Sequence, residues 1–223
     1  TQSPASGSNY PNQTVFEVGQ PIWYIRGYIY DGVKEDGTPD LRDVSGDGQI
    51  SDADMTYIGK GLPDYTYGIT VNLEWKGLDF MLFGSGQAGC EILNTLYRSG
   101  YHNSLSYFYL NSRSATNPNA KFPEPAKVSG DMNFWGSTAA VFDGSYFKIK
   151  QVQLGYTVPQ KWTKKALINQ LRLFVSLDDF FTFTSYPGMD PETATSGQAS
   201  GRGVDIGAYP SMRKVMLGVN VSF

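Results

Sequence analysis

The sequence is poor in the side chains that build disulfides and metal centres. It contains one cysteine, Cys90, and one histidine, His102. A single cysteine cannot form a disulfide within the chain. A single histidine cannot supply the several imidazole ligands of a multi-histidine zinc site. A disulfide-stabilised scaffold and a multi-histidine zinc enzyme are therefore excluded.

Charge and long apolar runs are also scarce. Charged residues make up 17% of the 223 residues, below the quarter typical of soluble domains. The net charge of −3 lacks the basic surplus of a nucleic-acid-binding protein. No apolar run approaches the roughly 20 residues of a transmembrane helix, whereas transmembrane β-strands leave a weaker signal. No signal peptide opens the chain, so we expect a mature protein or a piece that begins inside a longer one.

Aromatic residues are abundant, at 14% of the chain, and the clearest pattern lies in Arg213–Phe223. Apolar residues occupy every second position from Val215 to Phe223, and all the residues between them except Met216 are small or polar. Strict period-two alternation predicts a strand with one apolar face. This strand is either the edge of a soluble β-sandwich or an outer-membrane barrel strand whose apolar face contacts lipid.

Further stretches show the same alternation: Tyr65–Trp75, Leu78–Phe83, Gly144–Tyr156 and Leu171–Phe183. Lys76-Gly77 predicts a tight hairpin turn between the first two. In Gly144–Tyr156 the apolar positions change parity, which requires a β-bulge near Lys150-Gln151. Ile22–Tyr30 is rich in aromatic and β-branched residues and is predicted as another strand.

The connections between these strands alternate in length. Asp31–Asp64, Gly84–Phe142 and Thr184–Met212 are long and polar, whereas Lys76–Gly77 and Thr157–Asn169 are short. All long connections therefore fall on one side of the sheet, as in transmembrane barrels. At the short-turn end an aromatic girdle is predicted from Trp75, Tyr156, Trp162 and Phe223. We therefore predict an all-β fold of antiparallel transmembrane barrel strands, in preference to the sandwich.

The acidic stretch from Asp43 to Asp54 has the spacing of a twelve-residue calcium loop. The predicted calcium ligands are the side chains of Asp43, Ser45, Asp47 and Asp54 and the carbonyl of Gln49. Gly48 falls at the position of the sharp turn. The last ligand is Asp where a bidentate Glu is usual, so we expect modest affinity and a structural role. The alternative is a solvated Asp/Gly turn.

Several short motifs follow one another along the chain: Gly19-Gln20-Pro21, Gly27-Tyr28, Asp43–Asp54, Pro63–Gly68, Lys76–Phe80, Asp143–Lys150, Leu154–Pro159, Gly188–Glu192, Tyr209-Pro210 and Phe223. In this order they resemble the C-terminal part of SusC/RagA-type TonB-dependent outer-membrane transporters of Bacteroidetes. The resemblance covers residues 1–223, which we interpret as one segment of the barrel.

The resemblance implies roughly the last six strands of a barrel of about 22 strands, with long extracellular loops, in the bacterial outer membrane. It also implies a plug domain, the other barrel strands, a SusD-like lipoprotein, energy from the TonB system, and import of oligosaccharides or peptides. Phe223 matches the terminal aromatic residue read by the barrel-assembly machinery. Six strands cannot close such a barrel, so we expect another chain or a longer product to supply the rest.

Tyrosines in the second long connection are candidate contacts for substrate or partner, because aromatic rings stack on sugar faces. They are Tyr97, Tyr101, Tyr107 and Tyr109, together with the neighbouring Phe108, and packing within the loop is the alternative reading. The polar parity of the strands is expected to face the barrel lumen: Asn72, Glu74, Asp79, Arg172, Asp178, Asn220 and Ser222.

Two other functions fit parts of the sequence. One is a soluble, secreted, calcium-stabilised β-sandwich that binds carbohydrate. The other is a glycoside-cleaving enzyme, which needs two nearby carboxylates; Asp190 and Glu192, or the adjacent Asp178 and Asp179, are the available pairs. Adjacent residues of a strand face opposite sides, so we predict that the chain is not an enzyme.

Overall fold

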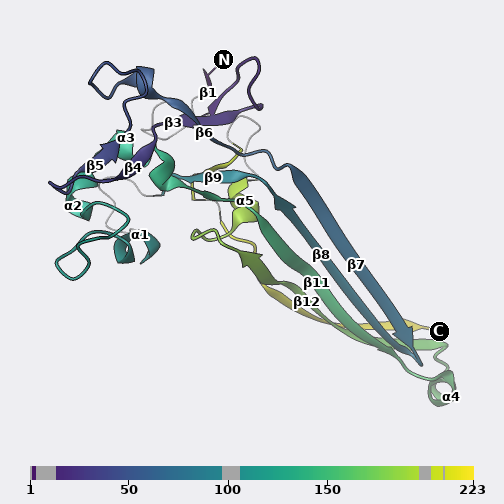
Figure 1. Cartoon of the computed structure of the whole chain (residues 1–223). Coiled ribbons are helices and arrows are strands. Elements are labelled where there is room, and N and C mark those ends of the chain that lie inside the picture. The colour runs from purple at the N-terminus through teal and green to yellow at the C-terminus, as the bar shows by residue number, and fades with distance from the viewer. Residues whose placement is uncertain (1, 4–13, 97–105, 196–201, 208) are drawn as a thin grey trace. The chain divides into compact units, whose positions relative to one another are not determined.

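A computed structural model describes residues 2–3, 14–96, 106–195, 202–207 and 209–223 (Figure 1). The chain divides into two compact units. The sheet unit comprises Tyr65–Ala88, Tyr146–Thr184 and Ser211–Phe223. The loop unit comprises Thr1–Asp64, Gly89–Ser145 and Ser185–Pro210. None of the helices in the described part of the chain is long and apolar enough to span a membrane.

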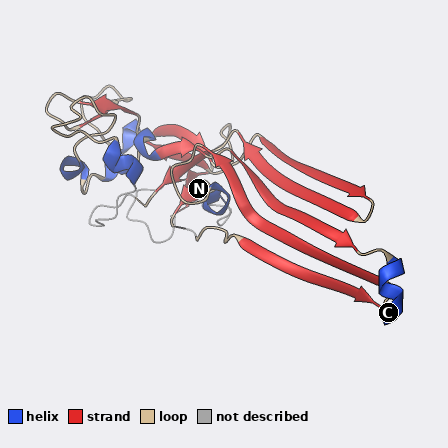
Figure 2. Ribbon diagram, turned by 90° about the horizontal axis from the view of Figure 1, so that it is seen from below, coloured by secondary structure: helices blue, strands red, loops and turns tan. Residues whose placement is uncertain are grey.

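The sheet unit is one antiparallel sheet of five strands in the order β14-β12-β11-β8-β7 (Figure 2). The strands are β7 (Tyr65–Trp75), β8 (Leu78–Ala88), β11 (Tyr146–Thr157), β12 (Gln170–Thr184) and β14 (Lys214–Ser222). Strands that follow one another along the chain are neighbours in the sheet, as the alternating sequence pattern predicted. The all-β prediction is confirmed.

Both short connections are tight. Lys76 and Gly77 have φ values of +47° and +89°. A two-residue hairpin turn with positive φ at both positions matches the twist of its strands, and glycine adopts it without strain. Between β11 and β12 lie the helical turns α4 (Gln160–Thr163) and η3 (Lys164–Ala166). The predicted turns are therefore present at one end of the sheet.

The predicted β-bulge is confirmed. The pairing of β11 shifts between Ile149 and Gln151 toward both of its neighbours. Opposite this point β12 has one more residue than β11, and Asp179 takes the left-handed φ of +55°. Because of the shift, Ile149 and Val152 lie on the same face of the sheet despite their opposite parity.

The loop unit holds the remaining secondary structure. A four-stranded sheet has the order β1-β2-β3-β6 and a three-stranded sheet the order β10-β9-β13. The bounds are β1 (Gln2–Ser3), β2 (Thr14–Val15), β3 (Tyr24–Gly27), β6 (Thr56–Lys60), β9 (Glu91–Asn94), β10 (Val141–Asp143) and β13 (Val204–Asp205), with a separate hairpin of β4 (Tyr30–Val33) and β5 (Pro39–Leu41). The helical turns are η1 (Asp52–Asp54), α1 (Ser106–Leu110), α2 (Pro125–Val128), α3 (Met132–Trp135), η2 (Thr138–Ala140) and α5 (Pro191–Thr195).

The prediction of one strand over Ile22–Tyr30 is wrong. The stretch divides into β3 and the start of β4, which belong to different sheets. Between them the Tyr28 N–H donates to the Gly136 carbonyl (3.1 Å) and the Thr138 N–H donates to the Tyr28 carbonyl (2.9 Å). The backbone of Tyr28 thus pairs with the segment that joins α3 to η2. This sixth predicted strand is therefore not part of the long sheet.

Aromatic side chains build the main core of the loop unit. Phe108, Phe122, Phe134 and Trp135 are buried together, with ring centroids 4.7 Å apart for Phe108 and Trp135 and 4.8 Å apart for Phe134 and Trp135. The Trp135 indole N–H donates to the Val128 carbonyl (2.8 Å). The long connection, predicted to be a polar loop, therefore folds around its own apolar core.

A series of buried side-chain hydrogen bonds joins β9 to β13. The Asn94 side-chain amide donates to the Tyr186 hydroxyl (2.9 Å), and this hydroxyl donates to the Asp205 carboxylate (2.5 Å). All three residues are at most 5% exposed. These hydrogen bonds give each of the three buried polar groups a partner, so none of the groups is buried with its hydrogen-bonding capacity unsatisfied.

Removing the Tyr186 hydroxyl tests how much these buried hydrogen bonds stabilise the loop unit. We expect Tyr186→Phe to destabilise the loop unit by about 1–3 kcal/mol, because Asn94 and Asp205 lose a buried partner. Hydrogen exchange of the β13 amides measures the effect. Tyr209→Phe is the control, since Tyr209 is 81% exposed. Equal protection of these amides from exchange in both variants would show that the buried hydrogen bonds do not stabilise β13.

Candidate functional site

One face of the five-stranded sheet is apolar from edge to edge. Across the strands the register aligns Leu73 with Phe80, Phe80 with Leu154, Leu154 with Val175, and Val175 with Leu217. The same face carries Tyr67, Ile69, Val71, Trp75, Leu78, Leu82, Phe147, Ile149, Val152, Tyr156, Leu171, Leu173, Leu177, Phe181, Phe183, Val215, Val219 and Val221.

This apolar face is exposed, even in the interior of the sheet. Leu154 in the central strand β11 is 48% exposed and Leu173 in β12 is 45% exposed. On the edge strands, Leu73 is 60% and Leu217 is 84% exposed. Every buried apolar residue in the described part of the chain belongs to the loop unit. A sandwich buries such a face against a second sheet, so the alternative of a soluble sandwich does not fit.

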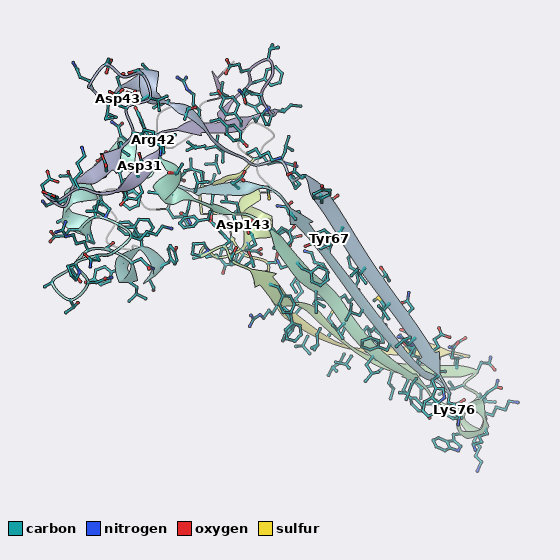
Figure 3. All side chains as sticks on the ribbon, viewed as in Figure 1. Asp31, Arg42, Asp43, Tyr67, Lys76 and Asp143 are labelled. Carbon is teal, nitrogen blue, oxygen red and sulfur yellow. The ribbon has the colours of Figure 1, made fainter. Side chains whose placement is uncertain are left out.

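Aromatic side chains mark both ends of the apolar face. Near the end joined by the long connections, the Tyr67 and Phe147 rings stack at 6.0 Å, and those of Phe147 and Phe183 at 6.4 Å. The predicted girdle lies at the other end, where Trp75 is 66%, Trp162 63% and Phe223 82% exposed. Figure 3 labels Tyr67 and Lys76, which lie toward opposite ends of β7. At ~3.3 Å per residue, Tyr67 and Trp75 are roughly 26 Å apart along the strand, near the ~25 Å band of membrane barrels.

The opposite face carries polar groups that meet across strands. The Arg172 guanidinium on β12 donates to both oxygens of Asp79 on β8 (2.9 and 2.5 Å), although β11 runs between these strands. Gly155 on β11 makes this possible, since a Cβ there would clash with both side chains. Of the predicted lumen residues, Asp79 and Arg172 are thus joined. The register places Asn72 and Glu74 opposite Met81 and Asp79, and Asn220 and Ser222 opposite Arg172 and Gln170.

A second charged group lies at the bulge. Lys148 is 2% exposed, and its ammonium lies 3.9 Å from Asp179; the Lys150 ammonium lies 3.4 Å from the same carboxylate. The Ser176 hydroxyl donates to Asp178 (2.8 Å) and accepts from the Gln151 amide (3.2 Å). Sequence reasoning missed this group because the extra residue in β12 was not visible in the apolar pattern. Asp178 and Asp179 are engaged here with neighbouring polar groups of the strands.

Asp190 and Glu192 lie at the start of the helical turn α5. The Asp190 carboxylate accepts from the Glu192 backbone N–H (3.1 Å) and the Asp190 carbonyl accepts from the Ala194 N–H (3.1 Å). Asp190 therefore caps the start of α5, with Pro191 in the first turn, where a missing N–H is tolerated. These contacts give the Asp190 carboxylate a capping role.

The acidic loop brings some of its predicted ligands together. Asp54 is fully buried, and one of its oxygens accepts from the Val44 and Ser45 N–H groups (3.0 and 2.9 Å) while the other accepts from the Ser51 N–H (2.7 Å). Asp43 accepts from the Gly46 and Gly48 N–H groups (2.6 and 2.7 Å).

This bonding pattern leaves few oxygens of the loop for a cation. The Ser45 hydroxyl donates to Asp43 (3.2 Å), and Asp47 accepts from the Gln49 N–H (2.8 Å). The described residues contain no group of three or more His, Cys, Asp or Glu side chains that could hold a metal. A carboxylate oxygen has two acceptor sites, so Asp54 retains one and could bind calcium only through one oxygen. The loop therefore supplies only some of the oxygen ligands that a calcium ion needs.

The Asp54 carboxylate makes the loop sensitive to acid. Hydrogen bonds from the backbone of Ser45 and then of Ser51 lower the pKa of Asp54 from 3.8 to about 2. A lowered pKa in the folded state stabilises the loop above pH 3.8, and this stabilisation disappears as the pH falls toward 2.

We expect the amides of Val44 and Ser45 to lose protection from hydrogen exchange between pH 4 and pH 2, and Asp54→Asn to remove this pH dependence. Exchange measured across this range tests the prediction. The same protection at pH 2 and pH 6 in the unsubstituted chain would contradict it.

The candidate tyrosines divide into different environments. Tyr97 and Tyr101 lie outside the described residues. Tyr107 packs on the aromatic core, with ring centroids 5.6 Å from Phe142 and 6.2 Å from Phe122. Tyr109 is 69% exposed. Tyr107 therefore has a packing role, and a contact with substrate or partner stays a prediction for Tyr109.

Sequence comparison relates the chain to receptors. No family model matches it. It is 34% identical to TonB-dependent receptor P3 of Formosa agariphila over 98% of the chain, and 28% identical to TonB-dependent receptor P26 of the same organism over 84%. The chain spans about a quarter of the first relative (24%) and 20% of the second. These relatives are receptors, which agrees with the expectation that the chain is not an enzyme.

Structural comparison supports the fold. The chain matches a RagAB peptide importer in the 'open-open' state with a TM-score of 0.74 and 22% identity, covering all of the chain and 25% of that protein. It matches the 'closed-closed' state with a TM-score of 0.73, also at 22% identity, covering 95% of the chain and 24% of that protein. The chain therefore shares its fold with about a quarter of this importer.

Proposed function

This chain belongs to the TonB-dependent receptors of the bacterial outer membrane, and we propose that it forms part of the wall of a barrel that imports a nutrient. One observation carries the proposal: apolar side chains such as Leu154 are exposed even on the central strand of the sheet, whereas every buried apolar side chain of the described residues belongs to the loop unit. Exposing this face to water would be unfavourable, and contact with lipid removes that cost. The polar face with Asp79 and Arg172 then lines the lumen.

The rest of the barrel must come from other segments. Within the described part of the chain, β7 and β14 have a neighbouring strand on one side only. An unpaired strand edge in lipid costs several kcal/mol for each unsatisfied backbone group. We propose that the edges pair with further strands of a barrel of about 22, which encloses a plug domain coupled to the TonB system.

We further propose a lipoprotein partner of the SusD type and a substrate that is an oligosaccharide or a peptide. A solved structure with the same fold is described as a peptide importer. Exposed aromatic side chains of the loop unit, Tyr109 among them, suit either substrate, because a ring packs on a sugar face or an apolar side chain. A lipoprotein is expected to bind on the side of the long connections.

Uptake by the native bacterium tests this function. Deletion of the receptor gene should abolish growth on one class of oligosaccharide or peptide, and the wild-type gene should restore it. A tagged receptor extracted in detergent should co-purify with a lipoprotein. Unchanged uptake of every oligosaccharide and peptide tested would contradict the import proposal, as would recovery of the native protein as a water-soluble monomer.

We also propose that the Asp43–Asp54 loop binds calcium weakly, because a cation there competes with backbone N–H groups for Asp43 and Asp54. Extracellular calcium modules bind with a Kd of about 10⁻⁴–10⁻³ M, and we expect this range. Titration calorimetry with calcium on the intact receptor should report it, and Asp47→Asn should weaken it. Absence of calcium binding up to ~10 mM would leave only the solvated turn.

A further inference from the structure

The short-turn end of the sheet unit is strongly basic, although the chain as a whole has a net charge of −3. Lys76 in the β7–β8 turn is exposed, as are the lysines between β11 and β12: Lys161, Lys164 and Lys165. The segments Glu74–Asp79 and 157–172 contain two carboxylates, of which Asp79 is bound by Arg172. Glu74 is thus the remaining acidic side chain beside four lysines.

The two turns form one continuous surface. The Thr157 N–H donates to the Gly77 carbonyl (2.7 Å), which fixes the end of β11 against the hairpin turn. This contact keeps Lys76 at the same end of the sheet as the lysines between β11 and β12. A hollow of about 670 Å³ beside it is lined by Glu74, Asp79 and Arg172 and therefore belongs to the polar face, so the exposed lysines of the two turns are the groups available to a headgroup.

Each turn pairs an exposed tryptophan with a lysine. The Lys76 ammonium lies 4.9 Å from the centre of the Trp75 ring, and the Lys161 ammonium lies 5.8 Å from that of Trp162. Trp75 is 66% and Trp162 63% exposed. Tryptophan prefers the boundary between acyl chains and headgroups, and a lysine stem lets its charge reach farther into the headgroup layer.

An apolar side chain extends this boundary. Leu167 is 84% exposed and follows the lysines at φ +59°. A single exposed leucine is common on water-facing surfaces, but beside the two tryptophans this side chain adds to the apolar part of the same surface. The surface thus combines apolar anchors, amphipathic rings and clustered positive charge.

We propose that this surface, defined by Trp75, Lys76 and residues 161–167, binds the headgroups of anionic phospholipids in the adjacent leaflet. The lysine ammoniums contact the phosphate oxygens, and Trp75 and Trp162 lie just below them. Each lysine near an anionic membrane surface adds to the attraction. The proposal rests on the membrane location of the sheet and extends the proposed function by a lipid preference.

The test uses the complete receptor purified in detergent. Native mass spectrometry measures binding of phosphatidylglycerol and of phosphatidylcholine to the unsubstituted protein and to K161Q/K164Q/K165Q. The matched control K34Q/K121Q/K127Q removes the same charge from the loop unit. We expect the unsubstituted protein and the control to prefer phosphatidylglycerol, and the first triple variant to lose at least tenfold of this preference.

Three results would overturn the proposal: equal binding of the two lipids by the unsubstituted receptor, an unchanged preference in K161Q/K164Q/K165Q, or complete displacement of phosphatidylglycerol by inorganic phosphate, which would indicate a site for free phosphate. If the triple variant does not fold, K164Q/K165Q replaces it with the same readout. Nutrient uptake is measured separately, so loss of import with intact lipid preference counts against the proposed function alone.

Discussion

Val152→Lys is expected to destabilise the membrane-inserted receptor by about 2–4 kcal/mol. The register aligns Val152 with Leu82 and Leu82 with Val71, which is halfway between Tyr67 and Trp75 on β7. A charge on the lipid face of a barrel costs this much near the bilayer midplane. Denaturant unfolding in lipid vesicles, followed by the heat-dependent gel mobility of folded barrels, measures the difference.

The neighbouring residue provides the control. Gln153 lies on the opposite face, where it pairs with Met81 and Ser176. Gln153→Lys adds the same side chain to the same strand, and we expect a change within about 0.5 kcal/mol, as for other substitutions at open polar positions. If both lysines cost the same, the two faces of the sheet meet the same environment and the assignment of lipid and lumen is wrong.

Phe134→Ala is expected to cost about 3–5 kcal/mol in the loop unit, the usual range for removing a buried phenylalanine. Phe134 is completely buried, and its ring contacts those of Tyr30, Phe108 and Trp135. Alanine would leave a cavity at the centre of this aromatic core. Limited proteolysis as a function of temperature measures the effect, because the helical turns around the core become cleavable when it opens.

Leu110→Ala serves as the control, since Leu110 is on α1 but 72% exposed. We expect its cleavage profile to match that of the unsubstituted protein. The gel mobility of the barrel should stay unchanged in both variants, because Phe134 and Leu110 belong to the loop unit. Early cleavage of Leu110→Ala with a stable Phe134→Ala would contradict the assigned core.

The strands of the sheet unit could be predicted because each one carries its own alternating pattern of apolar residues. Each strand is apolar at every second residue, and a lipid-facing wall requires this of every strand independently of its neighbours. Even the bulge at Lys150 leaves a trace, as the change of parity from Ile149 to Val152. The positive φ of Asp179 and its contacts with Lys148 and Lys150 leave none, because they depend on how β11 and β12 pair.

The loop unit was less predictable, since its strands and its core depend on contacts between residues that are distant in the sequence. The Tyr28 N–H donates to the Gly136 carbonyl across more than a hundred residues, and Phe108 and Phe134 meet from different helical turns. Neither pattern has a period that a single stretch reveals. In the acidic loop Asp43 and Asp54 lie beside Ser45, but the spacing could not show that backbone N–H groups occupy most of their acceptor sites.

Spin-label accessibility along β11 distinguishes a lipid-facing side of the sheet from a water-facing one. Single cysteines at positions 151 to 154, in a Cys90→Ser background, are labelled in the receptor inserted in bilayers. We expect labels at 152 and 154 to collide mainly with oxygen dissolved in lipid, and labels at 151 and 153 with a water-soluble paramagnetic reagent. Equal access of the aqueous reagent at all four positions, or shielding of 152 and 154 from both reagents, would contradict this expectation.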